Sequence, residues 1–315
     1  MKGEVCKYIE EFHANGKIPK GCNSSFIALI PKVDQPSNLG EYRPISLVGS
    51  MYKILAKLLS NRLKVVLPSV IYQTQSAFIG NRNLLHSILV ANETIDDAKR
   101  SKNKCFVLKV DYEKAFDSVN WDFLLYMLQR LGFCNQWRRW IEECMKTGHV
   151  SVLVNGSPTQ EFPLQRGIRQ GDPLAPFLYV IVAEGLAGLM RSAIRNNLYS
   201  SYCTRNNRVE VNLLQFADDT IFFGEASLSN VITIKAILRC FELVSGLKVN
   251  FHESRCGAIG TDQHVLVRFA TLLNCKIMDM PFNYLELPIG ANPRKLATWN
   301  PVIQKFKKKA CTLEK

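Results

Sequence analysis

The stretch Phe216-Ala217-Asp218-Asp219 decides the fold, because two adjacent carboxylates stand between two short apolar runs, at 211–215 and 220–223. Short apolar runs separated by a turn predict a hairpin of two buried strands. Two carboxylates at one tight turn repel each other. A divalent cation such as Mg²⁺ relieves that repulsion, because hard cations take carboxylate oxygens as ligands. A solvated acidic turn explains these four residues equally well, so the rest of the chain has to separate the two interpretations.

A third carboxylate, Asp111, follows a strand-like run at 105–110 in which alternate residues are apolar. The C-terminal end of a buried strand is a common position for a catalytic group on a scaffold of helices and strands. Two-metal phosphoryl transfer needs carboxylates that converge from separate strands to hold ions about 3.5–4 Å apart. The pattern of one strand-end carboxylate and one acidic hairpin meets that requirement.

Two cationic residues precede these carboxylates on a predicted β-hairpin. Lys32 follows the apolar run at 26–30, and Arg43 follows the turn-rich stretch after it. An arginine grips phosphate through two hydrogen bonds and a lysine acts as a point charge, so the pair suits a triphosphate, although surface cations are usually only solvated. Further on, Gln170-Gly171 lies in a loop whose glycines allow the backbone to approach a ligand closely.

The remaining pattern alternates strand-like runs with amphipathic segments. Apolar residues recur with helical periodicity at 51–67, 84–99, 121–131, 136–146 and 228–245. Alternating valines before Asn155-Gly156 predict a second hairpin, and Asp172-Pro173 predicts a helix start with the aspartate as its cap. Short strands are predicted near Val249 and Ala258. This order predicts an α+β fold with helices packed on a mainly antiparallel sheet.

Composition narrows the class of protein. The 315 residues are 47% hydrophobic, which is typical of one large or two ordinary globular domains. The 40 Lys+Arg against 27 Asp+Glu give a formal charge of +13, which favours a polyanionic partner such as nucleic acid. None of the 10 cysteines forms a Cys-x-x-Cys pair, so zinc spacing is absent and free thiols in a reducing compartment are expected. No secretory signal opens the chain, and we expect no apolar stretch of about 20 residues to span a membrane.

Taken together, these motifs resemble the reverse transcriptase of plant LINE-type non-LTR retrotransposons, and they are similar to group II intron reverse transcriptases. The motifs run in order over roughly residues 20–295 and are Leu29-Ile30-Pro31-Lys32, Tyr42-Arg43-Pro44-Ile45-Ser46-Leu47, Gln75-Ser76-Ala77-Phe78-Ile79, Asp111 through Asp117, Gln170-Gly171-Asp172-Pro173-Leu174, Phe216-Ala217-Asp218-Asp219, Ser245-Gly246-Leu247-Lys248-Val249-Asn250 and 284–290. The resemblance implies a right-hand polymerase fold with fingers, a palm built on an antiparallel sheet, and a truncated thumb. It divides the chain into a leader (1–22), a reverse transcriptase domain of fingers and palm (23–290), and a partial thumb or basic C-terminal end (291–315).

The resemblance also implies the reaction. Asp111 and Asp218 match direct ligands of two Mg²⁺ ions, with Asp219 beside them as the third catalytic carboxylate. The expected chemistry is in-line attack of a DNA primer 3′-hydroxyl on the α-phosphate of a dNTP, directed by an RNA template. No membrane partner is expected, and the family resemblance implies action inside the cell, in the nucleus.

Five further residues match the family's nucleotide-binding positions. Lys32 and Arg43 correspond to the fingers residues that hold the incoming triphosphate. Phe116, five residues after Asp111, corresponds to the bulky residue that rejects a ribose 2′-hydroxyl, although a core phenylalanine is the alternative. Gln170 and Gly171 correspond to the loop that lines the nucleotide and the template.

The chain departs from the family pattern at Gly80-Asn81-Arg82, where the family has Gly-Arg, and at three single positions. The family usually has Lys where this chain has Glu253, and that Lys is thought to protonate the leaving pyrophosphate; on a strand, His252 would face the other way. General acid assistance contributes about 10²–10⁴-fold. Glu286 replaces a glycine and adds strain if that position needs a positive φ, whereas Ala175 in place of Ser keeps a small residue. Two interpretations stay open here: an active RNA-directed DNA polymerase, and a truncated, catalytically poor relic that at most binds nucleic acid.

Overall fold

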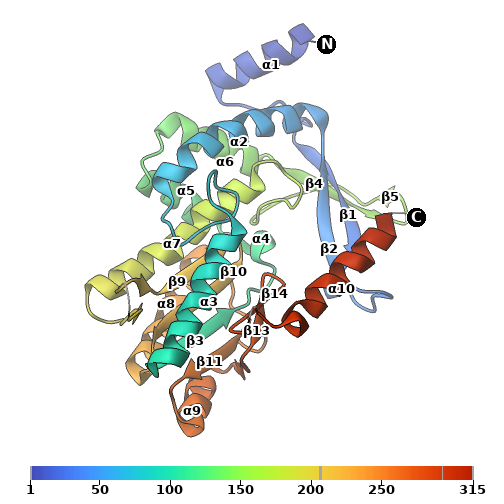
Figure 1. Cartoon of the computed structure of the whole chain (residues 1–315). Helices are drawn as coiled ribbons and strands as arrows, with labels where there is room; N and C mark the ends of the chain where they lie inside the picture. Colours follow the sequence, from blue (N-terminus) through green and yellow to red (C-terminus); the bar gives the residue numbers. More distant parts are fainter. Residues whose placement is uncertain (1, 206–207, 293, 314–315) are drawn as a thin grey trace.

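The computed structural model describes residues 2–205, 208–292 and 294–313, and Figure 1 shows their arrangement. The helices are α1 (Lys2–Asn15), η1 (Leu39–Glu41), α2 (Ser50–Val70), α3 (Leu84–Ser101), α4 (Ala115–Ser118), α5 (Trp121–Arg130), α6 (Asn135–Lys146), α7 (Ala175–Arg195), α8 (Leu228–Ser245), α9 (Gln263–Leu273) and α10 (Leu296–Leu313). The strands are β1 (Ser24–Pro31), β2 (Tyr42–Val48), β3 (Cys105–Val110), β4 (His149–Val154), β5 (Ser157–Pro158), β6 (Phe162–Pro163), β7 (Tyr202–Cys203), β8 (Glu210–Val211), β9 (Leu213–Phe216), β10 (Asp219–Glu225), β11 (Arg255–Ile259), β12 (Lys276–Ile277), β13 (Phe282–Tyr284) and β14 (Leu287–Ile289). The predicted α+β class is confirmed.

The central sheet has the strand order β12-β11-β3-β10-β9. Its ladders are antiparallel except for the short β11–β12 pair. The hairpin predicted around the acidic turn is therefore β9–β10, and β10 pairs directly with β3, the strand that ends before Asp111. The mainly antiparallel sheet predicted from the sequence is confirmed.

Both faces of this sheet are buried, because successive side chains of a strand point to opposite faces. On one face, Phe106 and Phe222 join a large apolar core that includes helices α7, α8 and α9. On the other face, Val107 and Phe223 join a smaller core formed with α3 and the β13–β14 hairpin. The sheet is thus the middle layer of three, and α3 crosses in front of it in Figure 1.

A second sheet has the order β2-β1-β4-β5, with β6 paired to β4. Strands β1 and β2 form the predicted antiparallel hairpin, and β1 pairs with β4 in parallel. The Asn155-Gly156 turn joins β4 to β5 as the sequence predicted. In Figure 1 this sheet extends away from the central sheet, beside the N-terminal end of α2.

One predicted helix start is wrong. The sequence favoured Asp172 as a cap and Pro173 as the first residue, but α7 begins at Ala175. The Oδ1 atom of Asp172 accepts the Leu174 N–H at 2.9 Å, while its Oδ2 accepts from the Tyr52 hydroxyl at 2.7 Å and the Arg169 guanidinium at 3.0 Å. The Asp172 carboxylate therefore connects its loop to α2 through Tyr52, and it is not the N-cap of α7. The strand predicted near Val249 is only an isolated bridge with Tyr112.

The expectation that no stretch is apolar and long enough to cross a membrane is wrong for α7. Among the described helices α7 alone meets that criterion of length and composition, but 67% of its apolar window is buried inside the protein. Glu184 interrupts the apolar run, and its side chain accepts a hydrogen bond from Arg191 at 2.7 Å. We interpret α7 as the core helix of the larger apolar cluster.

The last segment, 291–315, contains α10, which is coloured red in Figure 1. Phe306 and Lys307 are exposed on it. The side chains of Lys305, Lys308 and Lys309, and the residues Glu314 and Lys315, lie outside those that the structure describes.

Candidate active site

Three carboxylates converge at one edge of the central sheet. The antiparallel register pairs Thr220 of β10 with Val110 of β3. The ladder ends at this pair, and Asp111 and Asp219 are the residues adjoining it on the two strands. Burial, and in part repulsion from Asp111, raises the pKa of Asp219, so the Asp111 and Asp219 carboxyls lie within electrostatic reach of each other. Ala217 and Asp218 form the two-residue turn between Phe216 and Asp219, so Asp218 lies directly before Asp219. The register brings together the three carboxylates that the sequence singled out.

Ionisation of these three carboxyl groups is disfavoured in the folded protein. Asp111 and Asp218 reach solvent, yet the protein atoms packed around them desolvate their carboxyls and raise the pKa of each above its usual value. Burial also raises the pKa of Asp219, and repulsion by Asp218 adds to that effect. Groups that resist ionisation for these two reasons are stabilised by a nearby cation.

The donor set suits magnesium bound together with a substrate. Within 2–205, 208–292 and 294–313, no group of three or more His, Cys, Asp and Glu side chains is arranged to hold a metal ion by itself. Magnesium usually binds through one or two carboxylates plus substrate phosphates and water, not through a complete protein cage. Asp111, Asp218 and Asp219 supply hard oxygen ligands that repel one another, and these are the residues that would hold the ion.

Phe116 lies close to this edge on the short helix α4. Its half-buried ring stacks on the buried Tyr179, with centroids 4.6 Å apart and an interplanar angle of 21°. Its carbonyl accepts the Ile168 N–H at 2.8 Å. The stacking fixes the ring and the hydrogen bond fixes the backbone, so the side chain can restrict the space beside it. The packing on Tyr179 also makes Phe116 part of the core.

The Gln170-Gly171 loop joins the two sheets by close backbone contacts. The Ser46 N–H of β2 donates to the Gln170 carbonyl at 2.7 Å. Gly171 has φ +100°, and a Cβ there would lie 2.8 Å from the Ser46 carbonyl oxygen. Gly167 has φ +84°, and a Cβ there would lie 2.6 Å from the Asp117 carbonyl oxygen. Both positions require glycine, as the sequence predicted for a loop of close approach.

Lys32 and Arg43 are exposed on the two arms of the β1–β2 hairpin. Arg43 lies opposite Ile30, and the Lys32 ammonium donates to the Gly40 carbonyl at 3.0 Å. The positive charge of Arg43 lowers the pKa of Asp218, against the larger effect of burial. The hairpin therefore places at least one cation within electrostatic reach of the acidic edge.

Asp117 was not assigned a role from the sequence, although it closes the motif that begins at Asp111. Burial raises the pKa of this half-buried carboxyl, while a hydrogen bond from Gln170 and the charges of Lys114 and Lys32 lower it. The Gln170 amide nitrogen lies 3.4 Å from Asp117 Oδ1. Its position six residues after Asp111, on the same short segment as Phe116, was the available signal. Asp117 therefore lies beside the Gln170 side chain and within electrostatic reach of Lys32.

The family profile described as "Reverse transcriptase (RNA-dependent DNA polymerase)" matches residues 30–259 of the chain. This match includes every site residue described above and most of both sheets, but it excludes β12 and the first six residues of β1. The chain belongs to the reverse transcriptase family.

Two curated relatives of this reverse transcriptase domain are proteins of mobile elements. An uncharacterized 149 kDa protein of transposon TX1 from Xenopus laevis is 28% identical over 251 residues, which are 79% of this chain and 18% of that protein. The retrovirus-related Pol polyprotein from the type-1 retrotransposable element R2 of Popillia japonica is 27% identical over 243 residues, which are 76% of this chain and 32% of that protein. The domain is similar to those of non-LTR retrotransposons, and it spans no more than a third of the length of these two relatives.

A solved structure of telomerase from Candida albicans, in complex with a fragment of telomeric RNA, aligns with a TM-score of 0.56 at 11% identity. The alignment covers 96% of this chain and 52% of the telomerase chain. At this identity the likeness concerns the fold alone, and it confirms the predicted right-hand polymerase fold.

The reverse transcriptase domain has Glu253 in a turn, so the expectation that His252 and Glu253 lie on a strand is wrong. Glu253 Oε1 lies 3.0 Å from the Lys276 ammonium, and both side chains are exposed. This contact lowers the pKa of Glu253. The pKa of Asp111 is raised mainly by burial and, second, by repulsion from Glu253. A negative charge thus stands near the acidic edge where the family usually has a positive one.

Glu286 occupies the turn of the β13–β14 hairpin with a φ of +67°, and Leu285 before it has a φ of +51°. The condition under which the sequence predicts strain at Glu286, a positive φ, is therefore met. Side chains with a Cβ are disfavoured in this conformation, so the replacement of glycine by Glu286 strains the turn.

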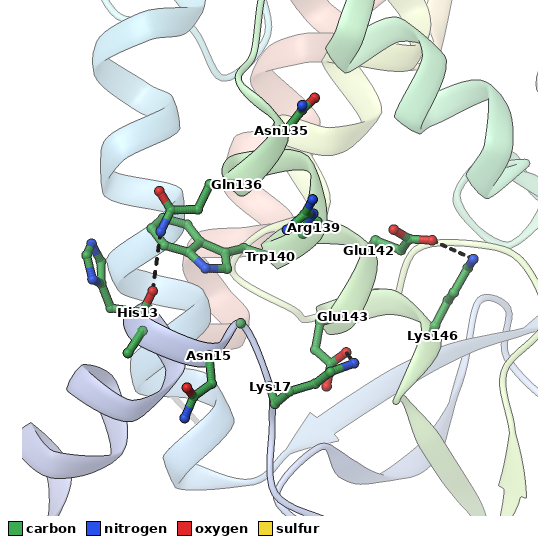
Figure 2. Close-up of a pocket in the computed structure, with 12 residues that line it drawn as sticks. His13, Asn15, Lys17, Asn135, Gln136, Arg139, Trp140, Glu142, Glu143 and Lys146 are labelled. Carbon is green, nitrogen blue, oxygen red and sulfur yellow. Dashed lines mark hydrogen bonds and ion pairs between the residues drawn. The ribbon is translucent and has the colours of Figure 1, made fainter.

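A cavity of about 720 Å³ lies elsewhere, between the C-terminal end of α1 and α6 (Figure 2). Its acidic residues are already paired: Glu143 with Lys17 at 3.2 Å and Glu142 with Lys146 at 2.6 Å. A smaller cavity, of about 530 Å³, is lined by Asp111 and Glu253. Size alone therefore does not locate the candidate active site, whereas the converging carboxylates do.

Proposed function

We propose that the chain is an RNA-directed DNA polymerase that extends a DNA primer on an RNA template with dNTPs. The observation that carries the proposal is the β3–β10 register, whose last pair, Thr220 and Val110, adjoins Asp219 and Asp111, with Asp218 in the adjoining turn. When bound there, two Mg²⁺ ions would supply positive charge to the attacking 3′-hydroxyl and to the leaving pyrophosphate. In the reaction, the primer oxygen forms a bond to the α-phosphorus while the bond from that phosphorus to the pyrophosphate oxygen breaks.

The other site residues bind and orient the nucleotide. Arg43 and Lys32 hold the triphosphate from the β1–β2 hairpin, and the reach of the Arg43 charge to Asp218 supports this role. Phe116, stacked on Tyr179, excludes a 2′-hydroxyl by occupying its space. Gln170 and Gly171 line the base and template side, and the close packing of Gly171 on β2 supports that role.

The proposal includes the origin and layout of the chain. We assign it to a plant LINE-type element related to group II intron reverse transcriptases, acting in the nucleus, on the strength of the ordered motifs in its sequence. The family match at 30–259 falls inside the proposed reverse transcriptase segment 23–290, leaving 1–22 as leader and 291–315 as partial thumb or basic end. A phylogeny of reverse transcriptase domains that places residues 30–259 outside plant elements would remove that assignment.

Primer extension tests the proposed activity. A primed RNA template, dNTPs and Mg²⁺ are incubated with the wild-type chain and with Asp218→Asn, and Asp122→Asn on the exposed start of α5 is the matched control. Loss of metal binding worth several kcal/mol predicts a decrease on the order of 10³-fold for Asp218→Asn and wild-type extension for Asp122→Asn. Equal extension by all three would refute the metal site. Template binding without extension by any of them would favour the catalytically poor relic suggested by Glu253 and Glu286.

A further inference from the structure

The acidic turn has an unfavourable backbone conformation. Ala217, the residue before Asp218, has a φ of +54°. An L-residue with a Cβ is disfavoured in this region, where glycine is the usual occupant. The turn therefore needs contacts from outside the hairpin to hold Ala217 and, with it, the direction of the two carboxylates that follow.

Gln75 supplies those contacts from 142 residues away in the sequence. The Ala217 N–H donates to Gln75 Oε1 at 3.0 Å, and Gln75 Nε2 donates to the Ala217 carbonyl at 3.5 Å. Gln75 Oε1 also accepts the Ala77 N–H at 3.0 Å. The side chain is completely buried, so no water replaces these bonds if the amide is removed.

The segment that carries Gln75 is itself fixed to the hairpin. The Gln215 N–H of β9 donates to the Thr74 carbonyl at 2.8 Å, and the Ser76 N–H donates to the Gln215 carbonyl at 3.0 Å. The Arg82 guanidinium donates to the carbonyls of Tyr72 and Gln75, each at 2.7 Å. These bonds fix the backbone on both sides of Gln75, so its amide meets Ala217 in one orientation.

We propose that Gln75 is a positioning residue that holds Ala217 in its left-handed conformation and thereby sets the orientation of Asp218 and Asp219 for divalent cations. The inference rests on the proposed metal site. Gln75 touches neither substrate nor metal in this role; it acts through the backbone of the turn.

The test measures the dissociation constant of Mn²⁺ from the full chain in the presence of a dNTP by electron paramagnetic resonance of the free ion, after subtraction of the Mn²⁺ that the dNTP binds without protein. Gln75→Met keeps the side-chain volume and leaves the Ala217 N–H unsatisfied, so we expect the dissociation constant to rise about tenfold. Ala217→Gly makes the hydrogen bonds from Gln75 unnecessary for the turn conformation, because glycine adopts positive φ freely. The double variant Gln75→Met/Ala217→Gly is expected to recover to within about threefold of wild type, a recovery that a merely structural role of Gln75 does not predict.

Gln215→Met is the matched control. Gln215 is equally buried and pairs with Gln75 in the same bridge, but its amide donates to the Ala183 carbonyl of α7 at 3.5 Å and not to the turn. We expect its Mn²⁺ affinity to stay within about twofold of wild type. Asp218→Asn distinguishes the two claims: if it leaves Mn²⁺ binding unchanged, the metal site itself is wrong.

If Asp218→Asn weakens Mn²⁺ binding while Gln75→Met does not, or if Gln215→Met weakens it as much as Gln75→Met, the positioning role of Gln75 is wrong. Should Gln75→Met fail to fold, Gln75→Glu decides the question. In this completely buried position the Glu carboxyl stays protonated, so one oxygen still accepts the N–H groups of Ala77 and Ala217 and the other donates to the Ala217 carbonyl. Mn²⁺ affinity within about threefold of wild type is therefore expected. A tenfold loss in that variant would overturn the proposal.

Discussion

The β9–β10 and β13–β14 hairpins each place a residue other than glycine at positive φ, and they differ in what surrounds that residue. In the β9–β10 hairpin, Ala217 has a φ of +54°; its N–H donates to the Gln75 amide oxygen and its carbonyl accepts from the Gln75 amide nitrogen. In the β13–β14 hairpin, Leu285 and Glu286 have φ values of +51° and +67° in succession. The first turn carries carboxylates of the candidate active site, whereas the second carries a departure from the family pattern.

The difference extends to the chemistry beside each hairpin. All carboxylates expected at the acidic edge are present next to β9–β10. The cavity beside Asp111 is lined by Phe282 and Asn283 of β13 and also by Glu253, the second departure. Backbone strain persists at a functional turn when neighbouring groups hold it in place. We infer that the acidic hairpin keeps a strained conformation for function, while the side of the sheet around Glu253 and Glu286 has lost favourable residues.

The largest expected effect comes from restoring a cation at Glu253. Glu253→Lys places an ammonium near Asp111 and removes the repulsion that raises the pKa of that carboxyl. General acid assistance contributes about 10²–10⁴-fold, so we expect primer extension to accelerate about a hundredfold. Glu253→Gln removes the charge without adding a proton donor and should give only a small gain. Equal rates for Glu253→Lys and wild type would sink the explanation that a proton donor is missing.

The next largest effect is expected at Phe116, on the side of the site where all the expected residues are present. Phe116→Ala removes the ring stacked on Tyr179 and opens space beside the nucleotide sugar. We expect ribonucleotide incorporation, relative to deoxyribonucleotide incorporation, to rise about tenfold or more, because a steric barrier against the 2′-hydroxyl is lost. Competition between labelled rNTPs and dNTPs measures this ratio. Phe133→Ala, at a half-buried ring next to Trp137, is the control and should leave the ratio unchanged; a shift of the same size there would show that Phe116 is only a packing residue.

A smaller effect tests the strain in the second hairpin. Glu286→Gly relieves a left-handed conformation, so we expect the free energy of unfolding to rise by about 1 kcal/mol and the melting temperature by about 2–4 °C. Calorimetry measures both quantities. Asn155→Gly is the control, because Asn155 also has a positive φ, of +50°, and asparagine tolerates that region. A stabilisation no larger for Glu286→Gly than for Asn155→Gly contradicts the comparison between the hairpins.

The smallest effect is the pH dependence of stability at the acidic turn. Burial raises the pKa of Asp218, so the folded state binds this proton more tightly than the unfolded state does, and ionisation costs stability as the pH rises through that pKa. Without divalent ions, Asp218→Asn is therefore expected to melt above wild type at neutral pH. The difference should shrink as the pH falls toward about 4, the ordinary carboxyl range. A difference that stays constant over that range, or grows on acidification, would show that the pKa is not raised.

Local signals in the sequence were sufficient for much of the fold. The predicted helix at 228–245 matches α8, because the residue that follows it, Gly246, takes a φ of +76° and ends the helix. The start of α7 was misplaced, because the Asp172 carboxylate binds Tyr52 and Arg169, which no local pattern reveals. Tertiary partners override capping preference at that position.

The candidate site divides in the same way. Apolar runs around Asp218 and before Asp111 were enough to predict that two strands carry the carboxylates, and pairing of those strands then brings Asp219 and Asp111 to the same end of their ladder. The Gln75–Ala217 contact was not predicted, because its partners lie 142 residues apart and no periodicity relates them. The Glu253–Lys276 pair was missed for the same reason: it depends on the β11–β12 ladder, which is too short to recognise in a sequence.

The most direct test of the central claim is a crystal structure of the chain soaked with Mn²⁺ and a dNTP, with an anomalous difference map calculated at the manganese absorption edge. The account predicts a peak between Asp111 and Asp219, within coordination distance of Asp218, about 2.0–2.3 Å. Asp218→Asn crystals treated in the same way should show that peak weakened or absent. A manganese peak elsewhere on the protein, with none at the edge formed by β3 and β10, would contradict the account.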